Sequence, residues 1–363
     1  MSNWQQMKIG DCLTIRYGKD QKSVENINGK YPILGTGGVI SRTNSFLYDK
    51  PSVLIGRKGT IDKPRYMDTP FWTVDTLFYS SINNNSIPKY IYYVFNTINW
   101  YKYNEASGVP SLAASTISSI KLNIPEKPEQ QRIVSVLETW DEYLEILDKK
   151  IALKEQLKKG LMQQLLTGAS RLFGFNGGWN EFRLQDVCTI RKGEQLNRNI
   201  MDNNGKFPVL NGGIGFSGYT DDYNTDENTI SMSEGGNSCG HISFLTKKFW
   251  CGGHCYRIIP NSKIDKSFLY QYLKIKQKFI MKLRVGSGLP NIQKKDIDRL
   301  KLFVPLDINE QQAIRTILGG YDEELKLLEQ KRKVIQNQKK YLLKNLITGK
   351  IFTSENLSMK GVN

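Results

Sequence analysis

The chain has 363 residues, of which 39% are hydrophobic, so it can bury two or three separate cores and is not a disordered protein. No apolar run approaches the ~18 residues of a membrane span, no signal sequence is visible, and the five scattered cysteines form no disulfide framework, so we expect a cytoplasmic protein with no membrane partner. The formal net charge of +16 indicates a polyanionic partner, most often a nucleic acid; the alternative is a basic protein without one.

The sequence contains an internal duplication, in which residues 4–168 recur with changes as residues 179–349. The matching segments stay in order, and their offset drifts only from 175 to 181 residues. They include Thr14-Ile-Arg-Tyr-Gly18 with Thr189-Ile-Arg-Lys-Gly193, Phe71-Trp72 with Phe249-Trp250, Ser107-Gly-Val-Pro110 with Ser287-Gly-Leu-Pro290, and Leu165-Leu-Thr-Gly168 with Leu346-Ile-Thr-Gly349. Two copies are too few for a solenoid, which needs at least about three units. We therefore predict a pseudo-twofold molecule.

Each copy begins with a globular segment, placed at residues 1–127 and 171–307. Short apolar runs punctuated by Gly and Pro predict strands in both. A helix is predicted over Pro88–Tyr101 in the first copy and over Asp265–Leu283 in the second. Each globular segment is thus expected to be a mixed α/β domain.

The two globular segments carry most of the excess charge, about +6 in the first and +7 in the second, whereas the first long helix between them carries −1. Their frameworks match but their polar loops do not: Arg57–Thr60 aligns with Glu234–Asn237, and Arg65-Tyr66 aligns with Ser243-Phe244. Unlike polar loops on a shared scaffold predict two versions of one binding domain that recognise different targets.

A long helix is predicted after each globular segment, over residues 128–170 and 308–350. In each helix eight of the ten heptad a and d positions are apolar, which indicates a sustained seam along a rod of roughly 55 Å. Asn309 is expected to cap the second helix, and Gly168 and Gly349 are expected to end the two helices.

In both helices the acidic residues come first and the basic residues follow. Parallel packing would place acid against acid, so we predict an antiparallel pair with the globular domains at opposite ends. The alternative is that the gradient only complements the macrodipole of each helix. The predicted fold class is α+β: two mixed α/β domains separated by a long antiparallel two-helix coiled coil, pseudo-twofold from an internal duplication, with residues 351–363 as a flexible tail.

No segment carries a known catalytic signature. The chain has no Pro-Pro of a methyltransferase tetrapeptide, no Walker phosphate loop and no His-Glu-x-x-His. Cysteines and histidines gather at Cys239, His241, Cys251, His254 and Cys255, but the paired spacing of zinc sites is missing and the first copy has no equivalent ligands. We therefore expect no metal and no cofactor in this chain.

Two unlike basic domains alternate with two similar helices that begin Glu-Gln-Gln-x-Ile and end Leu-Leu/Ile-Thr-Gly. Over essentially its whole length the chain thus resembles the specificity subunit of type I restriction-modification enzymes. The resemblance implies a non-catalytic bacterial or archaeal protein whose two target recognition domains each read one half of a bipartite site on double-stranded DNA. It also implies that the helices set the gap between the two half-sites and dock two modification subunits, which carry S-adenosylmethionine. Restriction subunits that use Mg and ATP to translocate and cleave DNA would join this complex.

Phosphate contacts give affinity, whereas a few side chains at base edges give sequence specificity. Because Arg pairs well with guanine and Asn with adenine, divergent polar residues are candidates for base readout. The DNA-binding candidates are Arg57, Lys58, Lys63, Arg65, Asn237, Ser238, Lys247 and Lys248, with Tyr101, Lys102 and Arg284 as phosphate-contacting or packing residues. For each of them the alternative is an ordinary solvated side chain.

Apolar residues outside the heptad seam predict a partner-binding face on the helices, formed by Ile146, Leu153, Leu157, Met162 and Leu327. Two readers fixed to one rod should meet half-sites about one duplex turn apart, ~34–36 Å. Three alternatives stay open at this point. They are a related system with a fused methylase-nuclease partner, a stand-alone DNA-binding protein, and an enzyme with an unrecognised nuclease site.

Overall fold

The computed structural model describes residues 4–202, 204–286 and 288–354. The chain divides into two compact units: unit 1 contains residues 1–148 and 330–363, and unit 2 contains residues 149–329. Each unit therefore combines one globular domain with the first part of one long helix and the last part of the other. The portion of the expected C-terminal tail from residue 355 onward lies outside the described residues.

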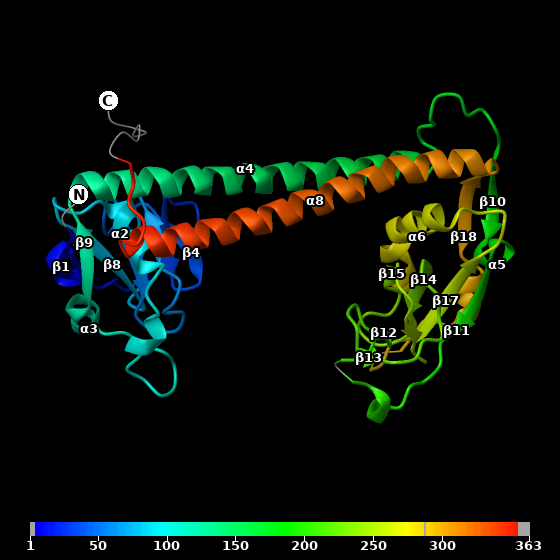
Figure 1. Ribbon diagram of the computed structural model, residues 1–363, viewed down its shortest axis with the longest axis horizontal. Coiled ribbons are helices and arrows are strands. Elements are labelled where there is room, and N and C mark those ends of the chain that lie inside the picture. The colour runs from blue at the N-terminus through cyan, green and yellow to red at the C-terminus, as the bar shows by residue number, and fades with distance from the viewer. Residues whose placement is uncertain (1–3, 203, 287, 355–363) are drawn as a thin grey trace. The chain divides into compact units, whose positions relative to one another are not determined.

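Unit 1 is built from three sheets and several helices (Figure 1). Its strands are β1 (Trp4–Lys8), β2 (Leu13–Arg16), β3 (Tyr31–Gly35), β4 (Gly38–Thr43), β5 (Ser52–Gly56), β6 (Arg65–Met67), β7 (Trp72–Thr73), β8 (Leu77–Ile82) and β9 (Lys121–Pro125). Its helical segments are α1 (Ile9–Cys12), α2 (Pro88–Phe95), η1 (Trp100–Tyr103), α3 (Ala114–Ser119) and the start of α4 (Lys127–Leu165). The main sheet has the antiparallel order β2-β8-β5-β6, beside a smaller sheet β4-β3-β7 and the ribbon β1-β9.

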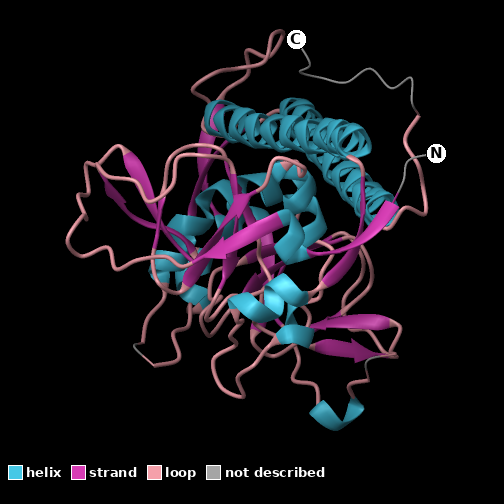
Figure 2. Ribbon diagram, turned by 90° about the vertical axis from the view of Figure 1, so that its left-hand side faces the viewer, coloured by secondary structure: helices cyan, strands magenta, loops and turns pink. Residues whose placement is uncertain are grey.

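Unit 2 repeats this architecture. The chain as a whole mixes helices, strands and long loops (Figure 2). Its strands are β10 (Trp179–Arg183), β11 (Cys188–Lys192), β12 (Phe207–Leu210), β13 (Gly218–Thr220), β14 (Thr229–Ser233), β15 (Ile242–Leu245), β16 (Trp250–Cys251), β17 (Cys255–Pro260) and β18 (Lys301–Pro305). Its helical segments are α5 (Leu184–Val187), η2 (Arg198–Ile200), α6 (Lys266–Ile280), η3 (Met281–Leu283), α7 (Lys294–Asp298) and the start of α8 (Ile308–Ile347). The sheet orders β11-β17-β14-β15, β13-β12-β16 and β10-β18 match those of unit 1, which confirms the duplication.

The core of each unit includes side chains from both long helices. In unit 1 Leu137 of α4 and Leu346 of α8 join the buried cluster around the main sheet. In unit 2 Leu165 of α4 and Leu318 of α8 occupy the corresponding cluster. These parts of the long helices thus belong to the globular cores. Burial of each of these leucine side chains stabilises its core by about 1.5–3 kcal/mol.

The helix in the first globular segment is shorter than the predicted Pro88–Tyr101. Helix α2 ends at Phe95, and η1 follows. The indole N–H of Trp100 donates to the carbonyl of Phe95 at 2.9 Å, and the hydroxyl of Thr97 donates to the carbonyl of Val94 at 2.7 Å. These side chains bind the carbonyls that a continued helix would use for its own backbone, so the helix stops.

Two predictions about helix ends in unit 2 also need correction. Helix α6 ends at Ile280, and the last three predicted residues form the tighter turn η3. The second long helix is capped by Asp307 and not by Asn309, since the backbone N–H of Asn309 donates to Asp307 Oδ1 at 2.8 Å. A carboxylate at this position satisfies an N–H that has no partner within the helix.

The Glu-Gln-Gln signature anchors each long helix to its domain. Gln130 Oε1 accepts the backbone N–H of Ile87 at 2.9 Å, and its Nε2 donates to the carbonyl of Pro125 at 2.9 Å. Gln311 makes the same two bonds in unit 2, with the N–H of Asp265 at 2.7 Å and the carbonyl of Pro305 at 2.9 Å. The second residue of the signature is therefore structural.

The buried glutamate of the signature receives a different partner in each unit. Glu310 is fully buried and pairs through both oxygens with the guanidinium of Arg171, at 2.9 and 2.6 Å. In unit 1 Glu129 pairs instead with Arg132, one turn along its own helix, at 2.6 Å, and accepts the hydroxyl of Thr353 at 2.8 Å. Both units thus satisfy a buried carboxylate, as burial of a charge requires.

Gly168 and Gly349 lie just beyond the long helices, where they were expected. Their φ angles are +73° and +68°, a left-handed conformation that favours glycine at a helix end. The ring of Trp179 lies 3.2 Å from where a Cβ of Gly168 would be, and Trp4 lies 3.1 Å from the same point on Gly349. No helix within the described ranges is both long and apolar enough to cross a membrane.

Within each unit the two long-helix segments run antiparallel. In unit 1 Asp141 pairs with Lys339 and Asp148 with Arg332; in unit 2 Lys154 pairs with Glu324 and Lys158 with Asp322. Residue numbers rise along one helix as they fall along the other. The local pairing thus follows the charge order that the sequence predicted, with acidic residues of one helix beside basic residues of the other.

Candidate nucleic-acid interface

The loops that differ between the copies follow β5 and β14, each of which is one of the two central strands of its main sheet. Arg57 comes directly after β5, and its backbone N–H donates to the carbonyl of Thr76 at 2.8 Å. Glu234 comes directly after β14, and its N–H donates to the carbonyl of His254 at 2.8 Å. Arg57 and Glu234 therefore occupy equivalent positions, which confirms the alignment made from the sequence.

A second equivalent contact holds the same loops. The N–H of Gly59 donates to the carbonyl of Pro110 at 2.8 Å, and the N–H of Gly236 donates to the carbonyl of Pro290 at 2.9 Å. Both glycines have positive φ, +90° and +75°, which a side chain would disfavour. The Ser-Gly-x-Pro signature therefore supports these loops, although Ser287 itself lies outside the described residues.

In unit 1 this position presents a cation. The Arg57 guanidinium lies over the ring of Tyr17, 5.4 Å from its centroid, and Nη1 donates to the carbonyl of Asp75 at 3.3 Å. Tyr17 is 54% exposed, and Lys58 beside it in the loop is also exposed. The aromatic ring orients the guanidinium at the surface, where further N–H groups can meet a ligand.

The other unit 1 candidates lie on separate segments. Arg65 of β6 reaches the turn between β3 and β4, where Nη2 donates to the carbonyl of Thr36 at 3.4 Å. Lys63 is exposed in the loop between β5 and β6, and Tyr101 and Lys102 are exposed on η1. The structure thus places Arg57 and Lys58 in one loop and Arg65 beside the adjoining β3–β4 turn, where Thr36 Oγ1 lies 3.6 Å from where a Cβ of Gly59 would be. Lys63, Tyr101 and Lys102 lie on other segments.

In unit 2 the equivalent position lines a cleft of about 600 Å³. Asn237 and Ser238, both candidates from the sequence, belong to it. Its full lining is Lys192, Asn211, Gly212, Gly213, Glu234, Gly235, Gly236, Asn237, Ser238, His254, Leu289, Pro290 and Asn291. A second hollow of similar volume shares Asn211 and His254 with this cleft, so the two hollows adjoin at these residues.

One oxygen of the Glu234 side chain accepts two hydrogen bonds. Its Oε1 atom accepts hydrogen bonds from Lys192 Nζ at 2.8 Å and from the Tyr256 hydroxyl at 2.9 Å. Burial, and then the Glu234 carboxylate, raise the pKa of Tyr256, so the hydroxyl stays protonated and donating. The unit 2 loop thus presents an acid where unit 1 presents a base.

The remaining unit 2 candidates lie outside the cleft. Lys248 donates to the hydroxyl of Tyr223 at 2.8 Å, lies over its ring and has Asp226 at 3.7 Å; the hydrogen bond to Tyr223 raises the pKa of Lys248. Lys247 and Arg284 are exposed. None of these three lines the cleft.

Sequence reasoning missed Tyr17, Lys192, Asn211 and Glu234 as site residues. A signal for two of them was available, because Tyr17 and Lys192 are the one difference between Thr14-Ile-Arg-Tyr-Gly18 and Thr189-Ile-Arg-Lys-Gly193. A change of residue inside an otherwise repeated motif marks a position where the framework is kept and the surface chemistry differs.

The cysteine and histidine cluster is part of the packing around the cleft. Cys239, Cys251 and Cys255 are buried, Cys239 Sγ donates to the carbonyl of Glu234 at 2.9 Å, and the N–H of Gly212 donates to Cys255 Sγ at 3.0 Å. Desolvation raises the pKa of the Cys239 thiol. Within the described ranges, no three His, Cys, Asp or Glu side chains are arranged to hold a metal ion.

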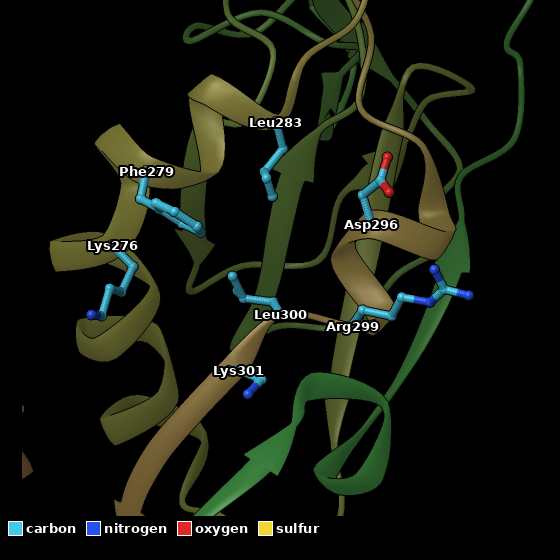
Figure 3. Close-up of a pocket in the computed structure, with 7 residues that line it drawn as sticks. All are labelled: Lys276, Phe279, Leu283, Asp296, Arg299, Leu300 and Lys301. Carbon is cyan, nitrogen blue, oxygen red and sulfur yellow. The ribbon is translucent and has the colours of Figure 1, made fainter.

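A separate cavity of about 460 Å³ lies among α6, η3 and α7 (Figure 3). Phe279, Leu283 and Leu300 form its apolar wall, and charged side chains surround it. None of its lining residues belongs to the loops that differ between the copies. It is therefore distinct from the cleft of Glu234.

Most of the predicted partner-binding residues on the long helices are exposed. Ile146 is 60% exposed, Leu153 66%, Leu157 50% and Leu327 55%. Met162 is an exception, because it is partly buried and packs against the core of unit 2. Its apolar side chain is explained by that packing, so the structure removes it from the exposed face.

The chain is similar to known proteins over most of its length. The model of the type I restriction modification DNA specificity domain matches residues 1–159 and 176–337. A putative type I specificity subunit of Mycoplasma genitalium is 35% identical over 155 residues, which is 42% of this chain and 40% of that protein. One from Mycoplasma pneumoniae is 33% identical over 149 residues, 40% of each chain, so the match spans about two fifths of these curated relatives.

More distant relatives match along the whole chain. A type I restriction enzyme specificity subunit of Methanocaldococcus jannaschii is 23% identical and covers 96% of this chain and 93% of that protein. The crystal structure of the type I restriction-modification S subunit from M. genitalium has a TM-score of 0.71 at 21% identity, covering 98% of this chain and 97% of that one. At this identity the structural likeness shows a shared fold.

Proposed function

The chain belongs to the type I restriction-modification DNA specificity family, and we propose that it is the specificity subunit of such a system, in which each globular domain reads one half of a bipartite site on double-stranded DNA. The observation that carries this proposal is the pair of equivalent loop positions, which present Arg57 in unit 1 and Glu234 in unit 2 on one backbone framework. Because a few side chains at base edges read sequence, unlike side chains at equivalent positions support unlike half-sites.

The charge distribution supports the same function. The globular segments carry about +6 and +7, and a basic surface gains affinity for DNA by displacing counterions from phosphates. We propose that this chain recognises the DNA sequence and catalyses no reaction itself. It would bind no cofactor of its own, while the modification subunits carry S-adenosylmethionine and the restriction subunits use Mg and ATP.

The long helices have two roles in this proposal. They form an antiparallel coiled coil that sets the gap between the half-sites, and they dock two modification subunits. The antiparallel ion pairs within each unit support the first role. Exposed Ile146, Leu153 and Leu157 on α4 and Leu327 on α8 support the second, since exposed apolar side chains on a helix favour a protein partner.

The proposal is tested by mapping methylated adenines across the genome of cells with and without this chain. We expect one bipartite motif, with a fixed gap, that is methylated only when the chain is present. Methylation that is unchanged by its removal would contradict the proposal. Cleavage of DNA by the purified chain with magnesium alone would instead show an enzyme.

The spacer role has a test of its own. Inserting one or two helical turns into both long helices, ahead of Gly168 in the first, should lengthen the gap in the methylated motif and leave both half-sites as they are. A change in the half-site sequences without a change in the gap would contradict it.

A further inference from the structure

The equivalent loop positions after the central strands differ in the sign of their charge. Position 57 is an arginine stacked on Tyr17, and position 234 is a glutamate paired with Lys192. We propose that this position reads a base in both units: Arg57 donates to guanine, and Glu234 accepts from the exocyclic amino group of cytosine or adenine. The inference rests on the proposed function and names the chemistry of its two readers.

The geometry of Glu234 leaves one oxygen for a ligand. Both donors that reach it, Lys192 Nζ and the Tyr256 hydroxyl, bind Oε1. Among the residues that the structure describes, no donor binds Oε2. The side chain is 14% exposed and belongs to the cleft of about 600 Å³. Oε2 is therefore a fixed acceptor at the edge of the cleft.

An acid in this place has few possible partners on DNA. A carboxylate is repelled by the phosphate backbone. If it loses water and finds no hydrogen-bond donor on the DNA, its desolvation costs free energy. In the major groove, the donors that bases offer are the amino groups of cytosine and adenine. Glu234 therefore disfavours guanine and thymine at the base it meets, and it contributes specificity and little affinity.

Arg57 has the complementary chemistry. Its loop is held by backbone bonds to Thr76 and Leu112, at 2.8 and 2.9 Å, and its guanidinium by the ring of Tyr17. Arginine donates to two acceptors of guanine, O6 and N7, in one plane. A fixed loop and an oriented side chain reduce the entropy lost on binding. The side chain at this position thus contacts a hydrogen-bond acceptor of a base in unit 1 and a hydrogen-bond donor of a base in unit 2.

The decisive variant is Glu234→Gln. Because Lys192 and Tyr256 both donate, the amide oxygen must take the place of Oε1, and the amide NH₂ then replaces Oε2. An acceptor becomes a donor with no change in size. We expect the preference at one base pair of the second half-site to move from cytosine or adenine toward guanine or thymine. The original discrimination should fall by roughly 10- to 100-fold, the value of one good base contact.

The measurement is binding of the complete methyltransferase complex to duplexes that carry each base at each position of the wild-type site. Glu181→Gln is the matched control, because Glu181 is an exposed acid on β10 paired with Lys301 and lies outside the cleft. Arg57→Ala should alter one position of the first half-site alone. Thermal unfolding of each complex shows whether it is folded.

The outcomes separate this inference from the proposed function. If the wild-type complex has no bipartite site, the proposed function is wrong. If that site exists and Glu234→Gln keeps every preference of the second half-site, the assignment of Glu234 is wrong. A uniform loss of binding to all duplexes also contradicts it, since a base reader changes the ratio between duplexes.

Discussion

The junctions between the long helices and the domains are nearly the same in the two units, whereas the loops after the central strands are opposite in charge. At the junctions Gln130 and Gln311 bind equivalent backbone groups. In the loops Arg57 and Glu234 share their backbone bonds but not their side-chain chemistry. At these two places the copies share the glutamine that binds the backbone and differ in the side chain that the loop presents.

The buried glutamates show that a requirement can be kept while its residues change. Glu310 is paired by Arg171, which follows α4, and Glu129 by Arg132, which lies in α4. Phe352 stands at the position equivalent to Arg171, and Ala313 at that equivalent to Arg132. Each unit thus has one of the two arginines and lacks the other. What both units retain is a partner for a buried carboxylate, because an unpaired one is strongly destabilising.

The largest expected effect is a loss of stability when the junction between α8 and its domain is broken. Gln311→Ala removes the three hydrogen bonds of this buried side chain, so the N–H of Asp265 and the carbonyls of Pro305 and Lys263 lose this partner. The free energy of unfolding should fall by about 2–4 kcal/mol, since each unsatisfied buried group costs ~1–3 kcal/mol. Urea unfolding of the full chain measures this. The neighbouring exposed Gln312→Ala is the control, and equal losses for the two variants would show that the motif is not an anchor.

The next effect concerns exposed apolar residues of α4, where substitution should weaken binding to the partner and leave the stability of the fold unchanged. Leu153→Ser and Leu157→Ser together should weaken copurification with the modification subunits more than ~10-fold, as loss of central apolar anchors does. The unfolding midpoint should stay close to wild type, because both residues are at least half exposed. Glu155→Ala, between them on the same helix, is the control. Undiminished copurification would place the docking surface elsewhere.

A loop exchange tests whether the two frameworks are equivalent. Arg57→Glu, Lys58→Gly and Thr60→Asn together give the unit 1 loop the sequence of the unit 2 loop and keep Gly59, whose φ is positive. The unfolding free energy should change by less than about 1 kcal/mol, as for surface substitutions that leave the backbone bonds intact. DNA selectivity should change in the first half-site only. Unfolding of unit 1, detected by hydrogen exchange, would mean that the loops are not interchangeable.

The smallest effect is a pH dependence of the stability of unit 1. A hydrogen bond from Arg332 lowers the pKa of Asp148 below its ordinary value of 3.8. A lowered folded-state pKa gives stability that is present above the unfolded-state pKa and lost as the pH falls through the folded-state value. Asp148→Asn should therefore make unit 1 slightly less sensitive to acid below about pH 4. Thermal unfolding between pH 3 and 6 measures it, and identical profiles would show that the pair contributes nothing.

Several features were correct from the sequence because they depend on local or periodic patterns. The repeat predicted two domains of like topology, and the alignment of Arg57–Thr60 with Glu234–Asn237 holds to the residue. Heptad spacing predicted both long helices, and charge order predicted the direction of their pairing within each unit. These signals recur along the chain itself.

Other features depended on contacts between distant segments. Helix α2 stops early because Trp100 folds back onto Phe95, and Met162 packs into a core that its helix position alone does not reveal. The cleft of unit 2 joins Lys192, Asn211 and Glu234 from three separate segments. Divergence within the repeat can point to such positions, but only the sheet order brings them together.

The sequence by itself determined that the chain consists of two copies of one unit, a globular domain followed by a long helix. The tertiary structure decided where the units divide: unit 1 takes the end of α8 from the far end of the chain, so that Gly349 packs on Trp4 and Thr353 binds Glu129. The physical reason is that helix formation is encoded by local periodicity, whereas the burial that completes a core depends on which distant surfaces fit together.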